Sequence, residues 1–113
     1  MLQNNLEFET LKSLDLFGGT GCISYELASR GAPDITIVEK DNKMYDFIKK
    51  TADELGFKNI NVVKSDVFRF IESTTQQYDF IFAGPPYALA TFDELPIKVF
   101  EKQLLKPGGW FVL

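Results

Sequence analysis

Short apolar runs that alternate with segments of helical periodicity constrain the fold of this chain more than any other feature of its sequence. The runs are rich in β-branched and aromatic residues, and they occupy residues 11–17, 35–39, 60–64, 78–83 and 110–113. Runs of this length and composition predict buried strands. Because strands and helices alternate, we expect an α/β fold with a doubly wound, mostly parallel sheet and right-handed crossovers.

Four helices are predicted between these strands. The first covers residues 22–30, the second follows Asp41 as its N-cap and ends at Gly56, the third covers 66–72, and the last begins near Pro96. Helical spacing predicts which apolar side chains face inward. They are Ile23 and Leu27 in the first helix, Met44, Phe47, Ile48 and Leu55 in the second, Val67, Phe70 and Ile71 in the third, and Ile97, Phe100 and Leu104 in the last.

Composition limits the size, the compartment and the chemistry. With 113 residues, of which 45% are hydrophobic and eleven are Phe, the chain can fill one core, so a single domain over 1–113 is predicted. The one cysteine, Cys22, cannot form an internal disulfide, which favours a reducing cytoplasm. The lack of His excludes His-dependent metal sites and Ser-His-Asp catalysis, and no apolar run is long enough for a bilayer. We therefore expect neither a metal nor a membrane partner.

Unusual residues follow four of the predicted strands. They are the glycine turn 18–21 after the first strand, Glu39 after the second, Asp66 after the third and the segment 84–87 after the fourth. In an open parallel sheet, ligands bind beyond the carboxyl ends of the strands, where the strand order reverses. The sequence therefore predicts a ligand site at this edge of the sheet.

The glycine turn indicates close approach of a ligand to the backbone. Gly18, Gly19 and Gly21 stand where a strand passes into a helix whose first N–H groups are free to bind a ligand. Asp15, late in the preceding strand, adds an acidic group aimed at that ligand. A dinucleotide fingerprint is the closest alternative, but it requires Gly or Ala where Ser24 stands.

Two further carboxylates are candidates for ligand contacts. Glu39 ends the second strand, where a carboxylate binds ribose hydroxyls, although a Glu that leaves a strand is ordinarily just solvated. Asp66 has two candidate roles, as an acceptor for an adenine amino group and as the N-cap of the next helix. These two roles are compatible with one another.

The segment Gly84-Pro85-Pro86-Tyr87 is the most specific signal in the chain. Its two prolines fix φ and remove N–H donors, which leaves carbonyl oxygens projecting from a stiff loop. Tyr87 follows directly and is suited to stacking on a flat substrate. The alternative, a rigid turn without function, is less favoured because the segment follows a strand at the predicted ligand edge.

These motifs carry a resemblance to a known family. The chain is similar to the bacterial class I methylases that use S-adenosylmethionine to modify the N2 amine of a guanine in small-subunit ribosomal RNA. The similar stretches are DLFGGTG (15–21), ISYELASRGA (23–32), IVEKD (37–41), SDVF (65–68), YDFIFAGPPY (78–87) and LLKPGGWFVL (104–113). They cover nearly the whole chain in the expected order.

The resemblance implies a Rossmann-like methyltransferase sheet of strand order 3-2-1-4-5 and a role for each motif. Gly18, Gly19 and Gly21 would pack against the methionine part of S-adenosylmethionine, with Asp15 nearby. Glu39 would bind the ribose hydroxyls, and Asp66 with the backbone of Val67 would bind adenine. The loop of Gly84, Pro85, Pro86 and Tyr87 would present Pro85 and Tyr87 to a flipped-out guanine.

The chain departs from this family at three places. Family members begin with a basic arm and a helix, and class I methyltransferases finish with a hairpin of two further strands; neither segment is found in residues 1–113. We therefore expect a truncated core that lacks these ends. The residue before Pro85 is usually Asp or Asn in the family, and here it is Gly84.

Charge bears on the predicted partner, which is ribosomal RNA or the small ribosomal subunit. The net charge is −4, and phosphate contacts need Lys and Arg, so the acidic balance fits a core whose basic arm carries these contacts. The lysines form no evident stripe and are interleaved with acids, which predicts an ordinary solvated surface.

Alternative functions remain open, and one association is expected. A related PPY loop also serves methylases that act on adenine or on a protein glutamine, and a non-catalytic S-adenosylmethionine-binding module is an alternative of a different class. An NAD-binding domain is disfavoured by Ser24. The turn 107–109 leads into the apolar last strand, 110–113. Because an exposed apolar edge pairs readily with another chain, we expect self-association there.

Overall fold

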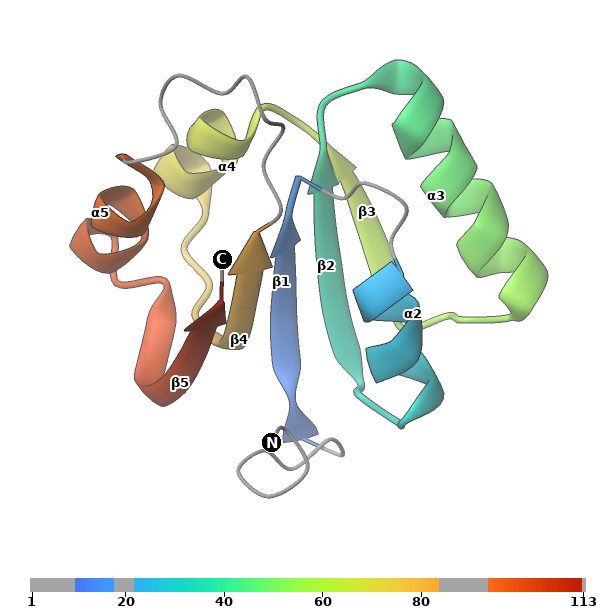
Figure 1. The fold of residues 1–113 in the computed structure, drawn as a ribbon, viewed down its shortest axis with the longest axis horizontal. Coiled ribbons are helices and arrows are strands. Elements are labelled where there is room, and N and C mark those ends of the chain that lie inside the picture. Colours follow the sequence, from blue (N-terminus) through green and yellow to red (C-terminus); the bar gives the residue numbers. More distant parts are fainter. Residues whose placement is uncertain (1–9, 18–21, 84–93, 113) are drawn as a thin grey trace.

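The computed structural model describes residues 10–17, 22–83 and 94–112 and contains one parallel sheet. Its strands are β1 (Lys12–Leu16), β2 (Asp34–Glu39), β3 (Ile60–Lys64), β4 (Tyr78–Ala83) and β5 (Leu105–Val112). They lie in the order β3-β2-β1-β4-β5, and every neighbouring pair is parallel (Figure 1). The parallel α/β fold and the strand order predicted from the sequence are therefore confirmed.

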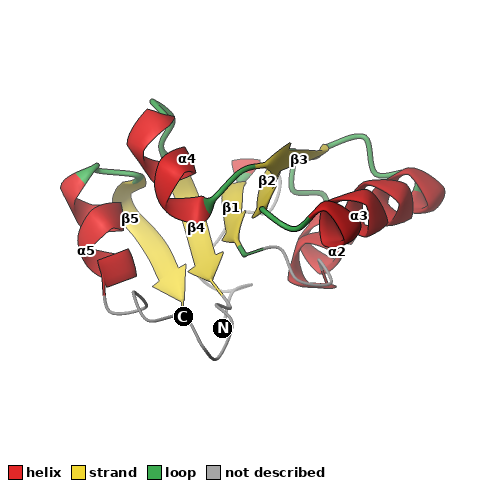
Figure 2. Cartoon of the chain, turned by 90° about the horizontal axis from the view of Figure 1, so that it is seen from above, coloured by secondary structure: helices red, strands yellow, loops and turns green. Residues whose placement is uncertain are grey.

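Helices cover both faces of the sheet. On one face lie α2 (Cys22–Ser29) and α3 (Asn42–Leu55), and on the other lie α4 (Val67–Ser73) and α5 (Glu94–Glu101) (Figure 2). Each helix follows one strand and leads into the next, which is the doubly wound arrangement. None of the described helices is long and apolar enough to cross a membrane. Among these same residues, no three Cys, Asp or Glu side chains gather as a metal site would require.

Helix boundaries follow the capping signals in the sequence. Asp41 is the N-cap of α3, and its side chain accepts a hydrogen bond from the Met44 N–H. Gly56 ends α3 in the left-handed conformation with φ of 76°. Asp66 is the N-cap of α4, and its side chain accepts from the Arg69 N–H. The caps predicted at Asp41, Gly56 and Asp66 are thus confirmed.

The core forms two clusters, one on each face of the sheet. Alternate residues of a strand point to opposite faces, so Leu14 and Leu16 pack with Ile81 on the α4 and α5 side. Phe80 and Phe82 belong to the cluster under α2 and α3, and their rings stack with centroids 5.7 Å apart. A strand buried on both faces explains why these runs are continuously apolar rather than alternating.

In two helices, α3 and α5, some of the apolar side chains that were predicted to face the sheet are exposed instead. In α3, Ile48 and Ala52 are buried, whereas Phe47 and Leu55 are 52% and 55% exposed. In α5, Leu95 and Val99 are buried, whereas Ile97 and Phe100 are 57% and 60% exposed. Both helices carry apolar residues on more than one side, so periodicity alone does not decide which side meets the sheet. Smaller differences concern Ile23, which is exposed, Phe70, which is half-buried, and Leu104, which is buried beyond the end of α5.

The predicted turn at residues 107–109 lies within β5 as an irregularity. Tyr78 pairs with Leu105 and Phe80 pairs with Trp110, so residues 106–109 stand opposite Asp79 alone. Gly108 has φ of 80°, which favours glycine. A Cβ at Gly109 would meet the Asp79 carbonyl oxygen at 2.8 Å, so no larger residue fits there without a shift. The strand therefore begins earlier, at Leu105, than the predicted residue 110.

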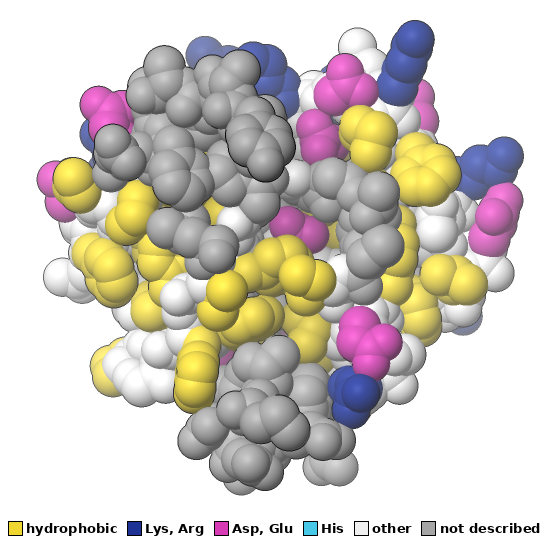
Figure 3. All heavy atoms as spheres, viewed as in Figure 1, with side chains coloured by type: hydrophobic (Ala, Val, Ile, Leu, Met, Phe, Trp, Pro, Cys, Tyr) yellow, Lys and Arg dark blue, Asp and Glu magenta, His cyan; other side chains and the backbone are white. Residues whose placement is uncertain are grey.

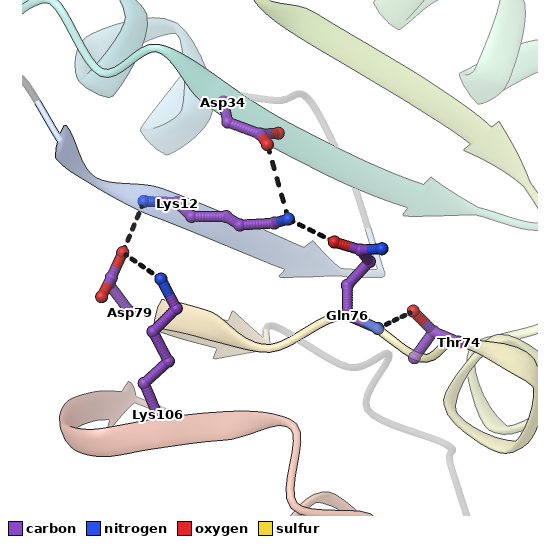
Figure 4. Close-up of polar contacts among 6 residues, drawn as sticks. All are labelled: Lys12, Asp34, Thr74, Gln76, Asp79 and Lys106. Atoms are coloured by element: carbon purple, nitrogen blue, oxygen red, sulfur yellow. Dashed lines mark hydrogen bonds and ion pairs between the residues drawn. The ribbon is translucent and has the colours of Figure 1, made fainter.

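A polar network joins four strands at the amino edge of the sheet (Figure 4). The Lys12 backbone N–H donates to Asp79 Oδ2 at 2.9 Å, and Lys106 Nζ lies 3.6 Å from the same oxygen. Lys12 Nζ donates to Gln76 Oε1 at 2.5 Å and lies 3.7 Å from Asp34 Oδ2. The charges at this edge are therefore largely matched with one another.

β5 forms one outer edge of the described sheet and carries exposed apolar side chains. Within the described part of the chain β5 pairs with β4 alone, and Trp110 and Val112 are 37% and 45% exposed. We expect the chain to self-associate through this strand, and Trp110→Lys to shift it toward monomer because a charge on the edge opposes pairing. Light scattering over a range of concentrations measures the change. Leu55→Lys, a similar exchange on α3, should leave the association unchanged, and a wild type that stays monomeric at every concentration would refute the prediction.

Candidate functional site

The strand register brings the predicted carboxylates to one edge of the sheet. Leu16, the last residue of β1, pairs with Val38 of β2 and with Ala83 of β4. Asp15 is one residue before that end, and Glu39 is the last residue of β2. Because the strands are parallel, their carboxyl ends all lie at the edge drawn uppermost in Figure 1. Asp15 and Glu39 therefore stand on neighbouring strands at the predicted ligand edge.

Asp15 is a buried acid in the central strand. Asp15 is 3% exposed, and the hydroxyl of Ser24 in α2 donates a hydrogen bond to Asp15 Oδ2 at 3.3 Å. Burial raises the pKa of Asp15 from its ordinary 3.8 to about 8; the Ser24 hydrogen bond partly opposes this shift, and the negative charge of Glu39 adds to it. A carboxyl that is costly to ionise is poised to gain from a positively charged neighbour.

Glu39 ties the end of β2 to the two segments beside it. Its Oε2 accepts the Asp41 N–H at 2.9 Å, which shapes the entry into α3. Its carbonyl oxygen accepts the Ser65 N–H at 3.1 Å, which joins the end of β2 to the chain that leaves β3. The side chain is half-buried. It is therefore more than a freely solvated carboxylate, and it is held at the predicted site.

Asp66 and Val67 lie at the start of α4. Asp66 is exposed, and its Oδ2 accepts the Arg69 N–H at 3.1 Å, so its role as an N-cap is confirmed. A contact with adenine stays a prediction. Val67 has a buried side chain that packs in the core, and its predicted part in binding used its backbone alone. Both residues follow the end of β3, where Lys64 pairs with Glu39, so they lie at the same sheet edge as Glu39.

The two predicted loops of the site lie outside the described residues. These positions are Gly18, Gly19 and Gly21 of the glycine turn and Gly84, Pro85, Pro86 and Tyr87 of the proline loop. The flanking strands fix where each loop leaves the sheet, because β1 ends at Leu16, β4 ends at Ala83, and these two residues pair. The glycine turn and the proline loop therefore depart from adjacent strands at the same edge.

Two features of the site were missed by the sequence analysis. Ser24 was weighed only as evidence against a dinucleotide fingerprint, yet it is fully buried and hydrogen-bonded to Asp15. Phe17, directly before the glycine turn, has φ of 72°, a conformation that bulky side chains rarely adopt. Strained backbone of this kind clusters at functional sites. For Ser24, the sequence did contain a signal: a polar residue on an otherwise apolar face of a short helix.

The buried acid makes stability depend on pH. Between pH 3.8 and about 8 the folded chain keeps the Asp15 proton that the unfolded chain releases, so this group lowers stability as the pH rises through that range. We expect Asp15→Asn to remove this loss and to raise the melting temperature at pH 8 by about 4–8 °C, which corresponds to roughly 1 kcal/mol in a small domain. The gain should be much smaller at pH 4.

Thermal unfolding at pH 4, 6 and 8 measures the effect. Asp41→Asn is the control, because Asp41 is exposed and Asn also serves as an N-cap. If wild type and Asp15→Asn lose stability in parallel as the pH rises, Asp15 is not the group responsible.

Known proteins similar to this chain include methyltransferases. A ribosomal RNA small subunit methyltransferase D of Buchnera aphidicola subsp. Baizongia pistaciae is 30% identical over 84 residues, which are 74% of this chain and 43% of that protein. A release factor glutamine methyltransferase of Shewanella oneidensis is 36% identical over 85 residues, which are 74% of this chain and 29% of that protein. The solved structure of a SAM-dependent methyltransferase from Agrobacterium tumefaciens has a TM-score of 0.78 and 27% identity, and the match covers 96% of this chain and 39% of that one.

This chain thus spans less than half the length of each of these three proteins. The resemblance to small-subunit ribosomal RNA methylases, stated from the motifs alone, is confirmed by the Buchnera relative. A family described as conserved hypothetical protein 95 matches residues 1–113. The chain therefore belongs to the conserved hypothetical protein 95 family, and its fold is that of the SAM-dependent methyltransferases.

Proposed function

We propose that this chain is the cofactor-binding core of a cytoplasmic methyltransferase that uses S-adenosylmethionine to methylate the N2 amine of a guanine in small-subunit ribosomal RNA. One observation carries the proposal. The buried Asp15 and the tethered Glu39 lie on neighbouring strands at the edge where the glycine turn and the proline loop leave the sheet. The name of the Buchnera relative supports ribosomal RNA as the substrate.

The charges of the site suit S-adenosylmethionine. When bound, this cofactor supplies a methyl group activated by a sulfonium. Its positive groups would favour the ionised form of Asp15, whose charge is otherwise penalised by burial. Ser24 holds the Asp15 carboxyl in place, and Glu39 offers acceptors for ribose hydroxyls. Asp66 and the backbone of Val67 would bind adenine at the end of β3.

The proline loop supplies the substrate side of the proposal. An exocyclic guanine amine is a poor nucleophile, because its lone pair is delocalised into the ring. Hydrogen bonds from the amine to protein carbonyls, including that of Pro85, favour a pyramidal nitrogen whose lone pair can point at the methyl group. Tyr87 would stack on the extruded base. These groups act by positioning and electrostatics, not by covalent chemistry.

A second substrate class has a specific observation in its favour. The release factor glutamine methyltransferase is more identical to this chain than the ribosomal RNA methyltransferase is, at 36% against 30%. A glutamine side-chain amide is also a planar, weakly nucleophilic nitrogen, so the same loop chemistry would serve it. Mass spectrometry of RNA nucleosides and of release-factor peptides after incubation with labelled cofactor distinguishes the two. Cofactor binding without either product would indicate a non-catalytic module.

Removal of the Glu39 carboxylate tests the cofactor site. We expect Glu39→Ala to weaken binding of S-adenosylhomocysteine by about 1–3 kcal/mol, the cost of leaving ribose hydroxyls without an acceptor. Isothermal titration calorimetry measures the affinity. Because Glu39 also accepts the Asp41 N–H, the control is Asp41→Ala, which disturbs the start of α3 but keeps the acceptor. Equal affinity of Glu39→Ala and wild type would remove Glu39 from the site.

Gly84 tests the substrate side. In similar enzymes an Asp or Asn before the two prolines accepts a hydrogen bond from the target amine, and glycine has no such oxygen. Loss of one pre-organised acceptor typically costs a hundredfold or more in rate. We therefore expect slow turnover on small-subunit RNA, and we expect Gly84→Asp to raise it by about that factor without tightening cofactor binding.

Single-turnover methyl transfer from labelled cofactor measures the rate. Gly84→Ala is the control, because it adds a side chain without an oxygen and should not increase the rate. A wild type that methylates as fast as Gly84→Asp would show that the acceptor is dispensable in this chain.

A further inference from the structure

The positive charges of the molecule fall into two groups that differ in their partners. All twelve Lys and Arg residues lie within the described parts of the chain. Six of them form ion pairs with Asp or Glu, and these six are Lys12, Arg30, Lys50, Lys98, Lys102 and Lys106. Two of these pairs belong to the network at the amino edge (Figure 4). The paired cations are thus occupied by the protein itself.

The other six cations lack an ion pair with any described residue, and four of them share one place. Lys40, Lys43, Lys64 and Arg69 are all exposed, and we call these four the basic rim. Of the remaining two, Lys49 lies over the Tyr45 ring with Nζ 5.8 Å from its centroid, and Lys58 lies in the turn before β3.

The fold brings the basic rim together at the carboxyl edge of β2 and β3. Lys64 is the last residue of β3 and pairs with Glu39, which Lys40 directly follows. Lys43 lies in the first turn of α3 and Arg69 in the first turn of α4. The hydrogen bond from the Ser65 N–H to the Glu39 carbonyl holds the two segments side by side. In Figure 3, Lys and Arg side chains project from this upper edge of the molecule.

The acids at this edge do not neutralise the basic rim by direct pairing. Glu39, Asp41 and Asp66 each accept a backbone N–H, at 2.9, 2.9 and 3.1 Å. Their short side chains are held close to the main chain at the starts of the two helices. The longer Lys and Arg side chains of the basic rim are exposed to solvent. The edge therefore presents exposed cations that form no ion pair with a described residue, beside acids that already accept backbone hydrogen bonds.

We propose that the basic rim binds phosphates of the RNA strand beside the target nucleotide. This inference rests on the proposed function, because it takes RNA as the substrate, and it places the RNA backbone over the β2 and β3 side of the site. Four cations spread over two strand ends match a run of phosphates better than they match one carboxylate of a protein substrate. Each phosphate that is neutralised releases counterions, which gives binding a steep dependence on salt.

An exposed aromatic residue beside the basic rim fits the same partner. Phe47 is 52% exposed and lies one helical turn after Lys43 on α3. Cations next to exposed aromatic rings are the pattern of surfaces that bind single-stranded nucleic acid, because the ring stacks on a base while the cations follow the backbone. Helical periodicity predicts Phe47 in the core, so this combination of cations and an exposed ring becomes visible only in the fold.

Simultaneous neutralisation of the basic rim tests the proposal. The rim variant is Lys40→Gln, Lys43→Gln, Lys64→Gln and Arg69→Gln in one chain. The matched control variant is Lys50→Gln, Lys58→Gln, Lys98→Gln and Lys102→Gln, which loses the same charge elsewhere. Binding to a transcript of small-subunit ribosomal RNA is measured by filter binding from 50 to 200 mM salt. We expect the rim variant to lose at least about tenfold in affinity, and its salt slope to fall by about 3, as the loss of four phosphate contacts implies.

The control variant should lose less than about threefold, and both variants should keep the wild-type melting temperature and affinity for S-adenosylhomocysteine. Equal losses in the two variants would overturn the proposal in favour of bulk charge. A rim variant that binds the transcript like wild type would overturn it and leave the proposed function standing. A wild type that binds S-adenosylhomocysteine but not the transcript would overturn both RNA statements. If, in addition, the rim variant alone lost binding to a release factor, the surface would belong to a protein substrate.

Discussion

Parallel pairing of β1 with a strand on each side is the constraint on which the rest of the structure depends. β1 has only five residues, yet it pairs with β2 and β4 and places Leu16 beside both Val38 and Ala83. This double pairing aligns the carboxyl ends of three strands and sends the following segments out from one edge. It also buries Asp15, since a residue in a strand covered on both faces has little access to water. The site and its perturbed acid thus arise from the same packing.

The strands and caps could be predicted from the sequence because their signals are local. A run such as 78–83 is apolar throughout, and Asp41 and Gly56 act on the backbone next to them. The inward faces of α3 and α5 could not be predicted, because Phe47 and Phe100 are as apolar as the buried Ile48 and Val99. Only packing against the sheet decides between such faces, and packing is a property of the whole fold.

The candidate site shows the same difference between signals that are local in the sequence and contacts that depend on the whole fold. Glu39 and Asp66 could be predicted as candidate site residues because they follow strands, and topology carries strand ends to a common edge. Ser24 was not assigned its role, since its bond to Asp15 joins a helix to a strand. The lysines appeared as an ordinary mixed surface, because the sequence cannot tell which cations are paired. In the fold, Lys12 is engaged at the amino edge while Lys40 has no ion pair with a described residue.

The two edges of the sheet therefore serve opposite purposes. At the amino edge, Asp79 accepts the Lys12 N–H and approaches Lys106, so charges stabilise the junction of three strands. At the carboxyl edge, Asp15 is buried at a cost in stability and Phe17 adopts a backbone conformation with φ of 72°. Strain and unfavourable burial persist only where the surrounding structure holds them in place. The matched network at one edge and the continuous core between the edges supply that support, so the predicted ligand edge keeps a buried carboxyl and a residue with positive φ.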